Sequence, residues 1–173
     1  SFSIGDKTKI LEKIDILVLK IKEIASPTDF DRRAIYSLEL KKKLILENTV
    51  DFKDLNLNND HLIHGDYLAH NVFFNDGVVS HVFDFEKTSY APRMFELFRS
   101  AYSSFSNQNN IDLYIQAYSK VYPISVDELE KGKKLYYLKL IHGVWVESEH
   151  YLKNNTRVDL FLEEGIRRIE NFI

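Results

Sequence analysis

Three consecutive segments in the middle of the chain read His64-Gly-Asp-Tyr-Leu-Ala-His-Asn71, Val72-Phe-Phe-Asn-Asp-Gly-Val-Val-Ser-His-Val-Phe83 and Asp84-Phe-Glu86. The second segment has two runs of β-branched and aromatic residues on either side of Asp76-Gly77, and this pattern predicts a β-hairpin. The segments before and after the hairpin are therefore brought to the same end of it.

Outward from the hairpin, apolar residues recur at helical spacing, and only three prolines and six glycines interrupt the 173 residues. This spacing predicts helices over residues 7–25, 29–47, 92–105, 111–122, 126–152 and 157–172. No repeat or linker divides the chain, so residues 1–173 are predicted to form a single domain. The fold class is α+β and mainly α, with helices, one hairpin and then more helices.

The composition excludes several classes of protein. With 45% hydrophobic and 28% charged residues, the chain has a real core and is not a disordered tail. A net charge of −3 without a basic block argues against nucleic-acid binding. Apolar runs are far shorter than the roughly 20 residues of a membrane span. Since cysteine and a signal segment are also absent, we expect a cytoplasmic protein without a membrane or nucleic-acid partner.

Two of the predicted helices carry polar residues whose positions we can anticipate. The lysine run at residues 41–43 is expected on a solvated face, opposite the inward residues Phe30, Ala34, Ile35, Leu38, Ile45 and Leu46. In the helix over residues 126–152, Trp145 is expected in the core with Val144 and Ile141. Glu147 and Glu149 are expected on the solvent-exposed face of the same helix.

The first segment matches the pattern H-x-D-x-x-x-x-N of a phosphotransferase catalytic loop. Such a site needs a carboxylate that orients and deprotonates the attacking hydroxyl, and hard oxygen ligands for Mg²⁺. Asp66, Asn71 and Asp84 offer these groups. There are two non-catalytic alternatives. Asp66 could be an ordinary helix-cap or turn residue, or the pattern could have arisen by chance in a helical interaction domain.

The hairpin gives this interpretation a geometric basis. If Asp76-Gly77 is a two-residue turn, counting outward pairs Asn71 with Val82. Asn71 and Asp84 are then diagonal neighbours on one face, roughly 7–8 Å apart at the backbone, where one ion can bind both side chains. A three-residue turn would instead place them on opposite faces.

In order and spacing, three sets of residues resemble the aminoglycoside phosphotransferase and choline kinase-like family, which shares the protein-kinase fold. They are His64-Gly-Asp66 with Asn71, Val82-Phe-Asp84-Phe-Glu86, and Ala91-Pro-Arg-Met-Phe-Glu96-Leu97. The chain departs from the family pattern in two places. Ala69-His70 stands where many members have Pro-Gly, and Glu96 stands where the usual residue is aspartate.

The resemblance implies a role for each of these residues. Asp66 would be the catalytic base, Asn71 and Asp84 would bind Mg²⁺, and His64 would support the loop. His70 and Glu86 are weaker candidates, since such a histidine is more often an ordinary loop or core residue and such a glutamate more often a solvated carboxylate. The implied activity is transfer of the ATP γ-phosphoryl group to a hydroxyl of a small molecule. An aminoglycoside is the first guess for the acceptor, with choline, ethanolamine, homoserine or a sugar open.

The resemblance also implies parts beyond this site. Trp145 and Glu149 are candidates for contact with a cationic acceptor, against the simpler assignment to core and surface. The residues before the loop lack the glycine-rich strands and strand lysine that cover ATP. We therefore expect this chain to be a C-terminal catalytic lobe, inactive without an N-terminal lobe, with an exposed interface that permits dimerisation. The alternative is a non-catalytic, kinase-like binding or scaffold domain.

Overall fold

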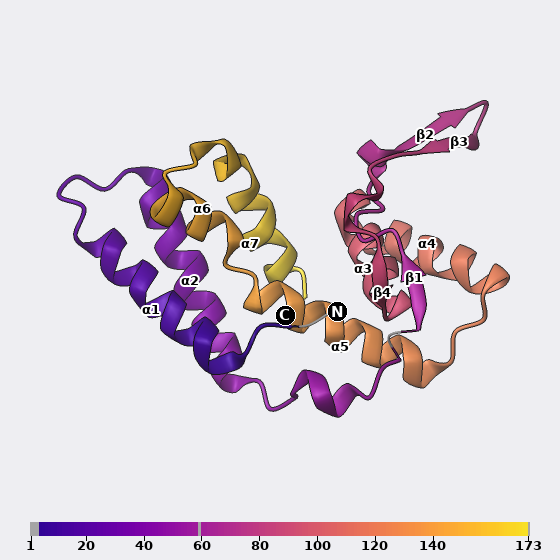
Figure 1. Cartoon of the computed structure of the whole chain (residues 1–173), viewed down its shortest axis with the longest axis horizontal. Helices are drawn as coiled ribbons and strands as arrows, with labels where there is room; N and C mark the ends of the chain where they lie inside the picture. The colour runs from indigo at the N-terminus through magenta and orange to yellow at the C-terminus, as the bar shows by residue number, and fades with distance from the viewer. Residues whose placement is uncertain (1–3, 59, 173) are drawn as a thin grey trace. The chain divides into compact units, whose positions relative to one another are not determined.

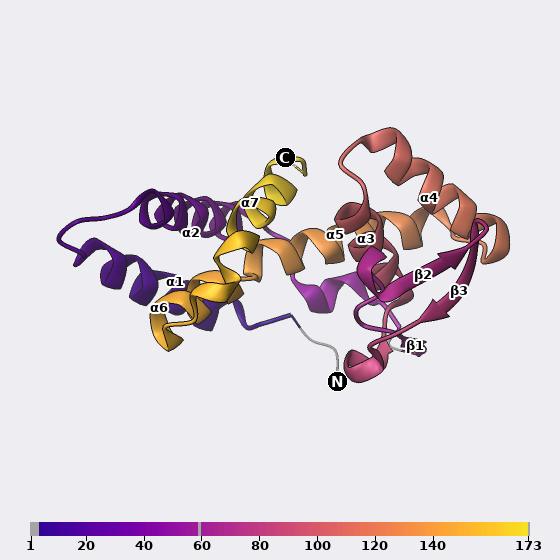
Figure 2. The same ribbon diagram turned by 90° about the horizontal axis from the view of Figure 1, so that it is seen from above.

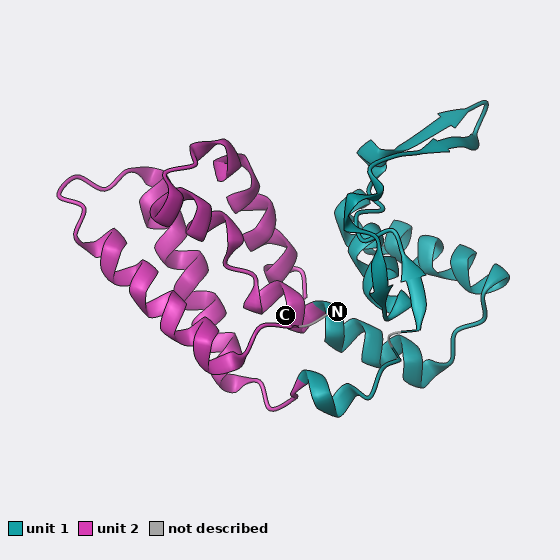
Figure 3. Cartoon of the chain, viewed as in Figure 1, with its two compact units in different colours: residues 1–3, 52–136 teal, residues 4–51, 137–173 magenta. Residues whose placement is uncertain are grey.

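The computed structural model describes residues 4–58 and 60–172 (Figure 1). Contacts divide them into two compact units (Figure 3). We call residues 52–136 the loop unit, and residues 4–51 with 137–172 the helical unit. The architecture is α+β and mainly α, as predicted. No helix in the described part of the chain has the length and apolar character needed to cross a membrane. The single domain stays a prediction.

Helices α1 (Lys7–Lys22) and α2 (Asp29–Glu47) open the helical unit. Asp6 caps α1 by accepting the N–H of Lys9, and Thr28 and Asp31 form a capping box at the start of α2. The rest of this unit comprises the end of α5 (Val126–His142), α6 (Trp145–Lys153), the 3₁₀ helix η4 (Thr156–Phe161) and α7 (Leu162–Glu170). Helix α1 packs against α2 and α6, and α2 packs against α7.

The solvated face predicted for α2 is wrong at Lys41. This lysine is buried, and its Nζ lies 2.8 Å from Oε1 of Glu147, which is itself completely buried. Ala34, Leu38, Lys41 and Ile45 follow helical spacing, so Lys41 lies on the buried stripe of α2. The prediction is also wrong at Leu46, which is 58% exposed.

The helix predicted over residues 126–152 is two helices, α5 and α6, separated at Gly143-Val144. The N–H of Gly143 bonds to the carbonyl of Leu140, three residues back, which closes α5. Since α6 starts a new helical phase, its faces do not continue those of α5. Trp145 is consequently 52% exposed and Glu147 is buried, the reverse of what the sequence predicted.

The loop unit contains two small antiparallel sheets beside helices (Figure 2). Strand β1 (His61–Ile63) pairs with β4 (Ser89–Ala91), a pairing that the sequence did not predict, and β2 (Val72–Asn75) pairs with β3 (Val78–Val82). Short 3₁₀ helices precede β1 (η1, Phe52–Leu55), precede β2 (η2, Ala69–Asn71) and follow β3 (η3, Phe85–Lys87). Helices α3 (Arg93–Ser104), α4 (Gln108–Val121) and the first part of α5 complete the unit.

The predicted hairpin forms, but its register is wrong at the open end. Asn75 pairs with Val78 as predicted, and a β-bulge then inserts Ser80 as an extra residue in β3. Beyond the bulge the pairing is shifted by one, so the N–H of Phe83 bonds to the carbonyl of Asn71 at 2.9 Å. Asn71 thus lies opposite Phe83 and not Val82. The prediction that Asn71 and Asp84 are diagonal neighbours on one face of the hairpin is therefore wrong, because Asp84 is only one residue beyond the partner of Asn71.

Candidate active site

Gly65 lets the loop between β1 and β2 pass close to η3. Its φ of +79° is in the left-handed region, and a Cβ at this position would lie 2.2 Å from the carbonyl oxygen of Lys87. Only glycine therefore allows this approach. The residues that follow Gly65 are held against those that follow Asp84.

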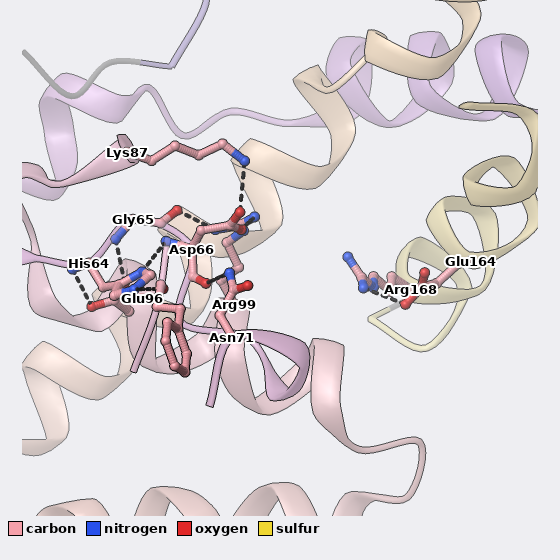
Figure 4. A network of polar contacts seen from close by, with 10 residues as sticks. His64, Gly65, Asp66, Asn71, Lys87, Glu96, Arg99, Glu164 and Arg168 are labelled. Atoms are coloured by element: carbon pink, nitrogen blue, oxygen red, sulfur yellow. Dashed lines mark hydrogen bonds and ion pairs between the residues drawn. The ribbon is translucent and has the colours of Figure 1, made fainter. Parts of the chain in front are cut away.

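Glu96 on α3 fixes the loop from the other side (Figure 4). Its Oε2 accepts the N–H of His64 at 3.0 Å, and its Oε1 accepts the N–H of Gly65 at 2.6 Å. A carboxylate that accepts two backbone N–H groups is a strong anchor. Glu96, which stands where the resemblance led us to expect an aspartate, therefore holds the loop in place.

His64 links the loop to the end of strand β3. Its Nδ1 accepts the N–H of Asp66 at 3.2 Å, so the ring proton lies on Nε2, which donates to the carbonyl of Phe83 at 2.7 Å. The ring is buried, and its centroid lies 4.5 Å from that of the Phe85 ring, with the two ring planes tilted by 50°. This is the geometry of a residue that supports the loop.

Asp66 is buried between two cations. Its Oδ2 accepts a hydrogen bond from Nζ of Lys87 at 2.8 Å, and its Oδ1 accepts one from the guanidinium group of Arg99 (Figure 4). Burial raises the pKa of Asp66. The hydrogen bond from Lys87, and the charge and hydrogen bond of Arg99, lower the pKa by more than burial raises it. Because the resulting pKa lies below its ordinary value, Asp66 is ionised at neutral pH.

Asn71 and Asp84 provide oxygen groups at the same end of the hairpin. The buried Asn71 donates from Nδ2 to the carbonyl of Asp66 at 2.9 Å, which leaves its amide oxygen for another partner. Asp84 has a φ of +61°, a conformation that costs free energy in a residue other than glycine. Its carboxylate is exposed and makes no hydrogen bond or ion pair within the described residues.

These two side chains fit a magnesium ion by their chemistry. An amide oxygen and a carboxylate are the hard ligands that Mg²⁺ prefers, and this ion commonly takes only one or two protein ligands beside phosphate and water. Over residues 4–58 and 60–172, no cluster of three or more His, Cys, Asp or Glu side chains offers a metal site. A magnesium site at Asn71 and Asp84 stays a prediction.

The remaining candidates lie apart from these contacts. The side chains of His70 and Glu86 are exposed and have no hydrogen bond or ion pair in the described part of the structure. Trp145 and Glu149 belong to the helical unit. There Trp145 contacts the ring of Phe161, and Glu149 bonds to Lys153 and Asn155 at the end of α6. Their contact with an acceptor stays a prediction.

The sequence interpretation missed Lys87 and Arg99, which both contact Asp66. A signal existed for Arg99, because it lies three residues after Glu96 and so shares a face of α3 with the residue that anchors the loop. Lys87 gave no such signal. Its contact depends on the path of η3 and on the close approach at Gly65.

Comparison with protein families finds one match in this chain. Residues 31–129, more than half of its length, match the phosphotransferase enzyme family. Comparison with curated proteins and with solved structures finds no match. The matched range contains Asp66, Asn71 and Asp84 and ends before Trp145.

Proposed function

This chain belongs to the phosphotransferase enzyme family, and we propose that it transfers the γ-phosphoryl group of ATP to a hydroxyl group of a small molecule. The observation that carries this proposal is the arrangement around Asp66. A loop anchored by Glu96 and His64 presents a buried, ionised carboxylate. Asp84, whose carboxylate has no partner among the described residues, follows Phe83, which is bonded to the end of the loop.

Each group has a role in the proposed reaction. The acceptor hydroxyl oxygen attacks the γ-phosphorus, the bond from that phosphorus to the β–γ bridging oxygen breaks, and its electron pair leaves with ADP. Asp66 orients the hydroxyl and takes its proton. Asn71 and Asp84 would hold Mg²⁺, which offsets the negative charge of the phosphates.

The same proposal extends to the fold. We assign the chain to the C-terminal lobe of a protein-kinase-like fold, with the β2–β3 hairpin between the catalytic loop and Asp84. The described residues before the loop form α1, α2, η1 and the short strand β1. The strands and lysine that cover ATP in such kinases would therefore come from a further lobe. Without it we expect little turnover from this chain alone.

The acceptor is a hydroxylated small molecule. An aminoglycoside is the first candidate, and choline, ethanolamine, homoserine and sugars are the others. These compounds form the panel on which the activity is tested, with ATP and Mg²⁺ as the phosphoryl donor and its metal.

The test compares Asp66→Asn with Asp112→Asn in the complete natural protein. Asp112 is an exposed aspartate on α4 outside the site, so its variant controls for the loss of one carboxylate. With the acceptor that the wild type uses, we expect Asp66→Asn to lower kcat about 100-fold to 10,000-fold and Asp112→Asn to leave it unchanged. Wild-type turnover by Asp66→Asn would remove Asp66 from this role. Failure of the wild type on every acceptor would favour a binding or scaffold domain.

A further inference from the structure

Two cations, Lys87 and Arg99, bind the single carboxylate of Asp66. Lys87 forms an ion pair with Oδ2 of Asp66, and Arg99 forms one with Oδ1. In a site that receives a triphosphate, a cation that can leave one carboxylate oxygen has a phosphate oxygen as an alternative partner. The two cations differ in how firmly they are held.

Arg99 is fixed. Its guanidinium group bonds to the carbonyl of Gly65 as well as to Asp66, and its side chain is only 26% exposed. A planar group with two acceptors in the loop stays in one orientation. Arg99 is therefore a structural partner of Asp66.

Lys87 combines a fixed backbone with a free side chain. Its carbonyl oxygen packs against Gly65 so closely that no Cβ fits between them, which sets the distance of its Cα from the loop. Its side chain, by contrast, is 62% exposed, and within the described residues its ammonium group bonds to Asp66 alone. A flexible ammonium group on a fixed base can reach a second acceptor near the first.

We propose that Lys87 is a phosphoryl-binding residue, whose ammonium group leaves Asp66 and binds an oxygen of the transferred phosphoryl group. This inference rests on the proposed function, because it takes Asp66 as the group that orients the acceptor. The exchange frees Oδ2 of Asp66 for the acceptor hydroxyl. Lys87 keeps its own proton throughout and donates a hydrogen bond to the phosphoryl oxygen, while the hydroxyl proton passes to Asp66.

The experiment measures binding of tripolyphosphate with Mg²⁺ to this chain by calorimetry. Tripolyphosphate presents the phosphates without the nucleoside, so the assay does not depend on a lobe that binds adenine. The variants are Lys87→Met, Lys87→Arg and, as a matched control, Lys120→Met, which removes an exposed lysine from α4. A further variant, Asp84→Asn, removes the charge of the proposed magnesium ligand and so tests the metal site.

We expect Lys87→Met to weaken binding about tenfold, as the loss of one charge-assisted hydrogen bond predicts. Lys87→Arg should stay within about threefold of wild type, because it keeps the charge and the donor. Lys120→Met should not change the affinity. In the wild type, the NMR signal of the Lys87 ε-methylene group should shift on addition of the probe.

Wild-type affinity in Lys87→Met, together with loss of binding in Asp84→Asn, would overturn this inference and leave the proposed function intact. Lys87 would then be only the counter-ion of Asp66. If the wild type does not bind the probe, or if Asp84→Asn binds it normally, the metal and phosphate site itself is wrong, and the inference falls with it.

Discussion

Gly65 holds the site together through the absence of a side chain. An added methyl group would meet the carbonyl of Lys87 and would also force a side chain into the left-handed region. Gly77 in the hairpin turn has nearly the same φ, +78°, but no atom within 4 Å of an added Cβ. A substitution at Gly77 therefore tests backbone strain alone, whereas one at Gly65 tests the same strain together with the steric clash against Lys87.

We expect Gly77→Ala to lower the free energy of unfolding by about 1–2 kcal/mol, the cost of left-handed backbone in alanine. Gly65→Ala should cost about 3 kcal/mol or more, because two backbones must also separate. Urea denaturation of both variants measures the difference. Equal losses would show that the contact between Gly65 and Lys87 is not close in solution.

At this scale the sequence predicted part of the site. His64, Asp66 and Asn71 are near one another in the chain, and the hairpin brings Asp84 back to them, so a local pattern was enough. The partners of Asp66 were not predictable in the same way. Lys87 and Arg99 reach it through the path of η3 and the packing of α3, which are tertiary features that no motif records.

Helices α2 and α6 are joined by a buried ion pair. Oε1 of Glu147 accepts hydrogen bonds from Lys41 at 2.8 Å and from Ser37 at 2.7 Å, and its Oε2 has no partner in the described structure. Removal of one member of such a pair leaves a buried charge without compensation, which typically costs 3–5 kcal/mol.

We therefore expect Lys41→Met to lower the free energy of unfolding by about 3 kcal/mol, and the double variant Lys41→Met with Glu147→Leu to recover most of that loss. Lys42→Met is the matched control, since its ion pair with Asp15 is exposed and should contribute less than about 1 kcal/mol. Chemical denaturation measures all three. A loss in Lys41→Met no larger than that in Lys42→Met would mean that the pair is not buried.

The elements themselves were predicted unevenly. Helix α2 has the predicted bounds, because a capping box starts it and an apolar stripe runs through it. The break between α5 and α6 escaped prediction, since one glycine within a helical pattern is often tolerated. The bulge at Ser80 was also missed. It shifts the register by one residue and so changes the partner of Asn71.

In the molecule as a whole, the groups proposed to act on phosphate all belong to the loop unit. Asp66, Asn71, Asp84 and Lys87 lie within residues 52–136. The family match covers most of that unit and extends into α2. The central claim is that the end of the β2–β3 hairpin and the catalytic loop form a binding site for a divalent ion and phosphate.

The most direct test of that claim is NMR of this chain with Mn²⁺, a paramagnetic substitute for Mg²⁺, in the presence of tripolyphosphate. The account predicts that the amide signals of Asn71 and Asp84 broaden first, and that Asp84→Asn abolishes this broadening. Broadening that begins at carboxylates elsewhere, or that persists at Asn71 in Asp84→Asn, would contradict it.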